Sequence, residues 1–119
     1  MDEIMVNGEL FVKKSIIREE AKTLDGLAYV IVRTHSAGVF AGYLESQNGQ
    51  EVIVRDARMI WYWEGACSLS QLAEDGTAAP KKCKFTVPVK KVKLLNVIAV
   101  YACAEKSRVS IAEVPAWKV

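Results

Sequence analysis

The stretch Leu27-Ala-Tyr-Val-Ile-Val-Arg-Thr34 decides the predicted fold, because its side chains alternate between two faces. β-Branched and aromatic residues, which favour strands, dominate it. Tyr29, Ile31 and Arg33 fall on one face, and the two valines fall on the other. We therefore expect a strand at this position.

The segments that follow predict a hairpin and one further strand. Residues 39–44 and 51–55 flank Asn48-Gly49, a pair that tolerates the positive φ angles of a tight turn. Residues 58–63 are expected to form a separate strand. The centre of the chain is therefore predicted to be strand-rich.

Helix signals appear in the second half of the chain. Ser68 and Gln71 lie three residues apart in a capping-box pattern, and Gly76 ends the short helix that they begin. Residues 104–113 are expected to form another short helix, which Pro115 ends. Two helices are therefore predicted after the central strands.

Further elements are expected on both sides of these helices. Residues 84–89 and 92–102 predict two strands, with Pro88 limiting the first to a sheet edge or a bulge. Near the N-terminus, a strand that contains residues 10–12 precedes a short helix from Ser15 to Gly26.

The whole chain, residues 1–119, is expected to be one α+β domain: a mostly antiparallel sheet with two or three short helices. Hydrophobic residues make up 51% of it and charged residues 25%, which is typical of a packed protein. A net charge of +2 argues against binding of a nucleic-acid polymer over the whole surface. The most apolar stretch, residues 94–104, is too short to cross a bilayer, and Met1-Asp-Glu-Ile4 lacks the order of a secretion signal. We therefore expect a soluble protein with no membrane partner.

The usual catalytic constellations are scarce. His35 is the single histidine, and no nucleophile motif or carboxylate cluster surrounds it. Cys67, Cys83 and Cys103 are odd in number and widely spaced, which indicates buried reduced thiols rather than a zinc site or disulfide bonds. We therefore predict a binding protein that uses no metal and no cofactor.

Arginines and aromatic residues supply chemistry for binding. Three guanidinium groups from strands expected to be neighbours can bind phosphate oxygens: those of Arg33, Arg55 and Arg58. Tyr62 shares a strand face with Arg58 and is a candidate to stack on a purine ring. Trp61 and Trp63 lie on the opposite face, which is more typical of a core or a subunit interface.

Six lysines follow one another without an intervening acid: Lys81, Lys82, Lys84, Lys90, Lys91 and Lys93. Such a cluster attracts anionic ligands, but lysines at a strand edge also prevent unwanted sheet pairing. Phe85 lies inside this cluster, and its ring either covers an adenine or occupies the core. Both alternatives stay open for the lysines and for Phe85.

Three segments resemble a family of small phage proteins. They are Tyr29-Val-Ile-Val-Arg-Thr-His-Ser-Ala-Gly-Val-Phe-Ala-Gly-Tyr43, Arg55-Asp-Ala-Arg-Met-Ile-Trp-Tyr-Trp63 and Gly65-Ala-Cys-Ser-Leu-Ser-Gln-Leu-Ala73. Cys83-Lys-Phe85 and the ending Val114-Pro-Ala-Trp117 extend the match. The chain resembles the first-described family of Thoeris anti-defence proteins.

The resemblance implies a phage- or prophage-encoded sponge that acts in the host bacterial cytoplasm. Such a sponge binds cyclised ADP-ribose signals made by TIR-domain proteins, such as glycocyclic ADP-ribose, without cleaving them, and so blocks Thoeris immunity. The family's members form homo-oligomers built from dimers, with the ligand between subunits, and some also bind cyclic oligonucleotides. A cyclised ADP-ribose offers an adenine for stacking and a pyrophosphate for arginine.

The resemblance also assigns ligand-binding roles to seven residues: Arg55, Arg58, Tyr62, Trp63, Phe85, Asn96 and Arg108. The chain departs from the family pattern at Met59, where another arginine is expected, and at His35, where a tyrosine is expected. These departures leave the preferred cyclic nucleotide open. For a sponge, we expect Arg58→Ala to weaken ligand uptake more than it lowers the melting temperature.

Two other functions compete with the sponge. The chain could be a phage protein–protein interaction module that uses the Trp61-Tyr62-Trp63 strand as an interface, since Trp and Tyr often anchor such contacts. It could also be a weak hydrolase of cyclic nucleotides that uses Asp56 or His35.

Overall fold

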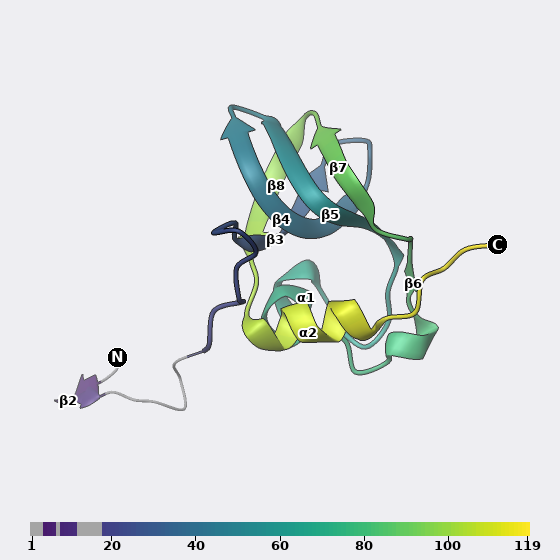
Figure 1. Cartoon of the computed structure of the whole chain (residues 1–119). Coiled ribbons are helices and arrows are strands. Elements are labelled where there is room, and N and C mark those ends of the chain that lie inside the picture. Colours follow the sequence, from purple (N-terminus) through teal and green to yellow (C-terminus); the bar gives the residue numbers. More distant parts are fainter. Residues whose placement is uncertain (1–3, 7, 12–17) are drawn as a thin grey trace.

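The computed structural model describes residues 4–6, 8–11 and 18–119 (Figure 1). Its strands are β1 (Ile4–Val6), β2 (Gly8–Phe11), β3 (Tyr29–Thr34), β4 (Val39–Asn48), β5 (Glu51–Tyr62), β6 (Lys84–Phe85), β7 (Val89–Leu94) and β8 (Val97–Ala102). Its helices are α1 (Leu69–Asp75) and α2 (Glu105–Glu113), and a 3₁₀ turn spans Pro80–Lys82. The α+β class predicted from the sequence is confirmed.

Six of the strands form one antiparallel sheet in the order β6-β5-β4-β3-β8, and β7 also pairs with β5. β6 pairs with the C-terminal part of β5, and β7 pairs with its N-terminal part, so both lie along the same edge of β5. β1 and β2 form a separate antiparallel pair. No helix in the described part of the chain is long and apolar enough to cross a membrane.

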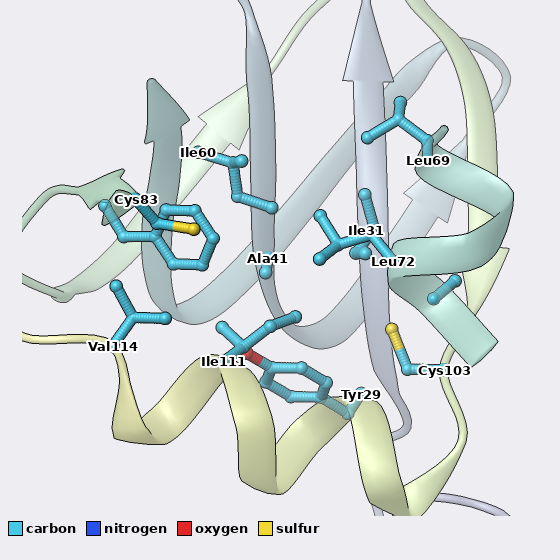
Figure 2. Close-up of a cluster of buried hydrophobic side chains, with 12 residues drawn as sticks. Tyr29, Ile31, Ala41, Ile60, Leu69, Leu72, Cys83, Cys103, Ile111 and Val114 are labelled. Carbon is cyan, nitrogen blue, oxygen red and sulfur yellow. The ribbon is translucent and has the colours of Figure 1, made fainter. Parts of the chain in front are cut away.

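The sheet is buried on both faces, because the alternation along its central strand places apolar side chains on each. Tyr29 and Ile31 of β3 point to the helices and pack with Leu72 and Ile111 in the larger core (Figure 2). Val30 and Val32 point to the opposite face, into a second core of small and branched aliphatic residues: Val52, Val54, Ala57, Leu94 and Val97. Both helices therefore cover one face only, as Figure 1 shows.

β5 is one long strand with a bulge, rather than the two strands expected over 51–55 and 58–63. Ala41 pairs with Arg58 and Tyr43 pairs with Arg55, so β5 contains one residue more than β4 across this interval. Asp56, inside the bulge, has a φ of 50°. The extra residue changes which face the following side chains take. Without it, Arg58 would share the valine face with Val54; with it, Arg58 lies on the helix face.

Several other expectations required correction. Residues 92–102 are not one strand, because Asn96, with a φ of 55°, lies in the turn between β7 and β8. The strand predicted over 84–89 ends at Phe85, and Val89 begins β7 instead. Residues 18–26 hold two isolated bridges and a turn rather than a helix, whereas Ser15 lies outside the described residues.

The Ser68 N-cap of α1 is confirmed, but the Gln71 side chain accepts from Cys67 rather than from Ser68, as a capping box would require. The Gln71 backbone N–H donates to Oγ of Ser68 at 3.1 Å, and the Cys67 N–H donates to Oε1 of Gln71 at 2.8 Å. The helix ends at Gly76, which has a φ of 74°. Pro115 follows α2 closely, as expected.

Gly42 makes the bulge possible, because β4 approaches β5 too closely there for a side chain. A Cβ at this position would lie 2.5 Å from Cγ1 of Val54 and 2.7 Å from the carbonyl oxygen of Arg55. We predict that Gly42→Ala lowers the free energy of unfolding by about 2 kcal/mol or more, measured by urea denaturation. The control Gly49→Ala has nothing within 4 Å and pays only for its φ of +62°, about 1 kcal/mol. An equal or smaller loss for Gly42→Ala would contradict this account of the bulge.

Candidate functional site

A small pocket lies where β3, β4 and β5 meet α2, next to the bulge. Its volume is about 200 Å³, and its walls combine two arginines, two tyrosines and a carboxylate with two apolar residues: Tyr29, Tyr43, Asp56, Arg58, Pro88, Arg108 and Ala112. We call it the arginine pocket. Pockets for drug-sized ligands usually measure about 300–1,000 Å³. The arginine pocket therefore has room for only part of a drug-sized ligand.

Arg58 is the buried arginine of the arginine pocket. Its Nε donates to the Thr86 carbonyl at 2.9 Å, its Nη1 to the Ile111 carbonyl at 2.8 Å and its Nη2 to the Phe85 carbonyl at 3.2 Å. Its guanidinium also lies 5.5 Å from the centre of the Phe85 ring. These contacts join β5 to the segment after β6 and to the last turn of α2.

The positive charge of Arg58 has no carboxylate partner among the described residues. The residue is only 7% exposed, and desolvation by burial lowers the pKa of its guanidinium. Carbonyl dipoles, including the negative end of α2, stabilise this charge only partly. An anion in the arginine pocket would therefore find a favourable potential.

Arg108 comes from α2 and is held by an acidic residue of the same helix. Its Nε donates to Oε1 of Glu105 at 2.8 Å and its Nη2 to Oε2 at 2.6 Å. Glu105 also accepts the Lys22 backbone N–H at 2.8 Å. Hydrogen bonds from Arg108 and then from Lys22 lower the pKa of Glu105 to about 2. Glu105 does not use Nη1 of Arg108, and the Tyr43 side chain also interacts with this guanidinium and helps to raise its pKa.

Tyr29 and Tyr43 add aromatic surface to the pocket. They are paired across β3 and β4, and their rings meet edge to face with centres 4.9 Å apart. Burial raises the pKa of the Tyr29 phenol most, and the nearby Cys103 and Tyr43 raise it further. Tyr29 therefore stays a neutral hydroxyl that can donate a hydrogen bond.

Of the residues predicted to bind a ligand, the structure brings Arg58 and Arg108 together. Arg55 lies on the same strand before the bulge, where its Nε donates to Oε1 of Glu45 at 2.7 Å. It lines a neighbouring hollow of about 450 Å³ with Lys90 and Lys91. Arg55 therefore borders a second basic surface rather than the arginine pocket.

Arg33 and Asn96 lie away from this pocket. Arg33 is exposed on β3. β4 lies between β3 and β5, so these two strands are not neighbours, contrary to the expectation. Asn96 is exposed in the β7–β8 turn, and its carbonyl accepts the His35 N–H at 2.9 Å. Neither side chain lines the arginine pocket.

The three predicted aromatic ligands have other surroundings. Phe85 is fully buried in the larger core, so the core alternative is correct and its ring is covered by protein. The Trp63 indole is half-buried and donates to the Ala66 carbonyl at 3.1 Å. Tyr62 is 42% exposed, and its hydroxyl donates to Glu64 at 2.6 Å. None of these three side chains lines the arginine pocket.

An exposed aromatic pair was not predicted. Trp61 is 54% exposed and Trp117 is 45% exposed, and their ring centres lie 4.7 Å apart. The ammonium group of Lys84 lies 5.5 Å from both rings. Trp117 reaches this place because its backbone N–H donates to the Phe85 carbonyl at 2.9 Å. No local sequence pattern predicts this contact.

The remaining chemical groups are dispersed. Cys83 and Cys103 are buried free thiols, but Cys67 is exposed, which corrects the expectation that all three are buried. Among the described residues, no group of three His, Cys, Asp or Glu side chains could hold a metal ion. Of the two alternative hydrolytic residues, Asp56 lines the arginine pocket and His35 does not.

Comparison with known proteins adds one match. Residues 27–111 match a family model described as a domain of unknown function, DUF6948. No curated protein and no solved structure matches the chain. The matched range covers β3 to most of α2 and so includes every residue of the arginine pocket except Ala112.

Replacement of Arg58 tests its structural role. We predict that Arg58→Ala lowers the free energy of unfolding by at least about 3 kcal/mol in urea denaturation, because three carbonyls lose their donor. The variant therefore loses stability as well as any ligand affinity. Arg33→Ala, on the exposed face of β3, should change stability by less than about 0.5 kcal/mol. Equal effects of the two substitutions would contradict the role of Arg58.

The Glu105–Arg108 pair predicts a dependence of stability on pH. Because folding lowers the pKa of Glu105 from 4.5 to about 2, its stabilising effect is complete above pH 4.5 and is lost as the pH falls towards 2. Glu105→Gln should therefore lose less stability than the wild type over this interval, measured by urea denaturation at several pH values. Glu113→Gln, an exposed control at the end of α2, should follow the wild type. If the unfolding free energy of Glu105→Gln falls with pH as steeply as that of the wild type, the role of the pair is contradicted.

Proposed function

We propose that this chain, which belongs to the family described as domain of unknown function DUF6948, is a non-catalytic sponge for a phosphorylated nucleotide. The finer proposal is that the ligand is a cyclised ADP-ribose signal, held intact so that Thoeris immunity is blocked in the host cytoplasm. The observation that carries the proposal is the buried guanidinium of Arg58, without a carboxylate partner in the described chain, beside Arg108 in one pocket.

The pocket chemistry supports binding of a phosphate group. Arg58 contributes a positive charge that carbonyl dipoles stabilise only partly. Arg108 contributes a guanidinium whose orientation Glu105 fixes before the ligand arrives. An arginine held in place loses less conformational entropy on binding than a free one. Tyr29 and Tyr43 add hydroxyl donors and ring surface for the rest of the ligand.

The size of the pocket supports a shared site. A cavity of about 200 Å³ in one subunit is below the range of drug-sized ligands, so a whole cyclised ADP-ribose needs further walls. In this proposal a second copy of the chain supplies them in a dimer or an assembly of dimers. The aromatic surface that stacks on the adenine then comes from the partner subunit.

Recovery of the ligand tests the sponge directly. The protein is incubated with a cyclised ADP-ribose, freed of unbound ligand, denatured by heat and examined by mass spectrometry. We predict stoichiometric release of the intact ligand. Release of a cleaved product would identify an enzyme, and no uptake would refute the proposal.

A matched pair of variants on α2 tests the location. We predict that Arg108→Gln weakens uptake at least about tenfold, because it removes a charge-assisted hydrogen bond to phosphate. Lys106→Gln removes one positive charge from an exposed position on the same helix and should bind as the wild type does. The same loss in both variants would indicate a general charge effect rather than a site at Arg108.

The exposed Trp61–Trp117 pair favours a second candidate, a protein–protein interaction module. Exposed tryptophans are frequent anchors of interfaces. A stoichiometric protein partner in a pull-down, lost in Trp61→Ala and accompanied by no thermal shift with nucleotides, would favour the module over the sponge.

A further inference from the structure

We propose that Asp56 binds the sugar hydroxyls of the ligand, so that the arginine pocket selects a ribose-bearing phosphate over a bare phosphate. This inference rests on the proposed function and deepens it, because it names the chemical feature by which the pocket chooses its ligand. The residue concerned is a carboxylate in the wall of a pocket that otherwise attracts anions.

The backbone positions this carboxylate by means of the bulge. Asp56 has a φ of 50°, a left-handed conformation that is uncommon for residues other than glycine but is tolerated by Asp and Asn. Opposite it, only a glycine at position 42 leaves enough room for β5 to approach β4. Bulges beside functional sites commonly redirect a side chain. Here the redirected side chain lines the arginine pocket.

The hydrogen bonds of the arginines near Asp56 go to acceptors other than its carboxylate. Arg58 donates to three carbonyls, Arg108 is paired with Glu105, and Arg55 donates to Glu45 at 2.7 Å. Within the described chain, no salt bridge or side-chain hydrogen bond involves Asp56. The carboxylate is therefore available in the pocket to accept hydrogen bonds.

The combination of groups constrains the ligand. An ionised carboxylate only accepts hydrogen bonds and repels phosphate, so in a site for bare phosphate it would be unfavourable. A ligand that carries hydroxyl donors next to its phosphate satisfies both parts of the pocket. Ribose linked to a phosphate has this arrangement, and acidic residues bind ribose hydroxyls in dinucleotide-binding folds. The volume of about 200 Å³ suits such a fragment of a larger nucleotide.

The test compares two probes on Asp56→Asn. Asparagine keeps the shape of the side chain and tolerates the left-handed backbone, so the bulge is preserved. Affinities for cyclic ADP-ribose and for inorganic pyrophosphate are measured by titration calorimetry. We predict that the variant binds cyclic ADP-ribose about tenfold or more weakly. Pyrophosphate, which has no hydroxyl donors to offer, should bind equally well or more tightly.

Controls separate this inference from the proposed function. Asp75→Asn removes the same charge at the end of α1, outside the pocket, and should leave both affinities unchanged. If the wild type binds cyclic ADP-ribose and Asp56→Asn binds it equally well or more tightly, the role of Asp56 is refuted while the proposed function stands. If the wild type binds neither probe, both are refuted.

Discussion

The described structure depends on the hydrogen bonds that Arg58 donates to three carbonyls. These bonds join the longest strand of the sheet to the segment after β6 and to the last turn of α2. Without them, a guanidinium and three backbone acceptors would be buried with no partners, at a cost of several kcal/mol. Arg58 therefore holds the helix against the sheet and, at the same time, lines the arginine pocket.

The bulge at Asp56 is what gives Arg58 this position. A regular strand would place the arginine among the valines on the other face, where no polar group could accept its hydrogen bonds. One extra residue, together with the missing side chain at Gly42, brings Arg58 to the helix face and Asp56 to the pocket wall. A single irregularity of the backbone thus connects packing with binding chemistry. The C-terminal segment is attached to the same structure, because the Phe85 carbonyl accepts from both Trp117 and Arg58.

Patterns that act over a few residues could be predicted from the sequence. The alternation around Tyr29, the turn at Gly49 and the helix cap at Ser68 all depend on neighbours in the chain, and all are present. Features that depend on distant pairing could not. The bulge requires β4 opposite β5, so the sequence predicts two strands where the structure has one. At Asn96 the sequence predicts a single strand where the structure has a turn between β7 and β8.

In the candidate site, too, local patterns predict some residues, whereas the arrangement of these residues depends on distant pairing. The sequence predicts Arg58 and Arg108 as binding residues, but their meeting in one pocket depends on how α2 packs on the sheet. Tyr43 joins them through the register of β3 with β4, which single-sequence patterns do not determine. The sequence does not decide whether Phe85 contacts a ligand or the core, because alternation in a short strand does not show which face the C-terminal segment covers. For the same reason, the sequence does not predict that Trp61 and Trp117 lie side by side.

The central claim is that the arginine pocket holds a phosphorylated nucleotide and leaves it whole. A crystal structure of the protein with a cyclised ADP-ribose tests it most directly. The account predicts an uncleaved ligand with phosphate oxygens within hydrogen-bonding distance of the guanidinium groups of Arg58 and Arg108. A ligand bound elsewhere, for example on Trp61 and Trp117, or a cleaved product in the pocket, would contradict it.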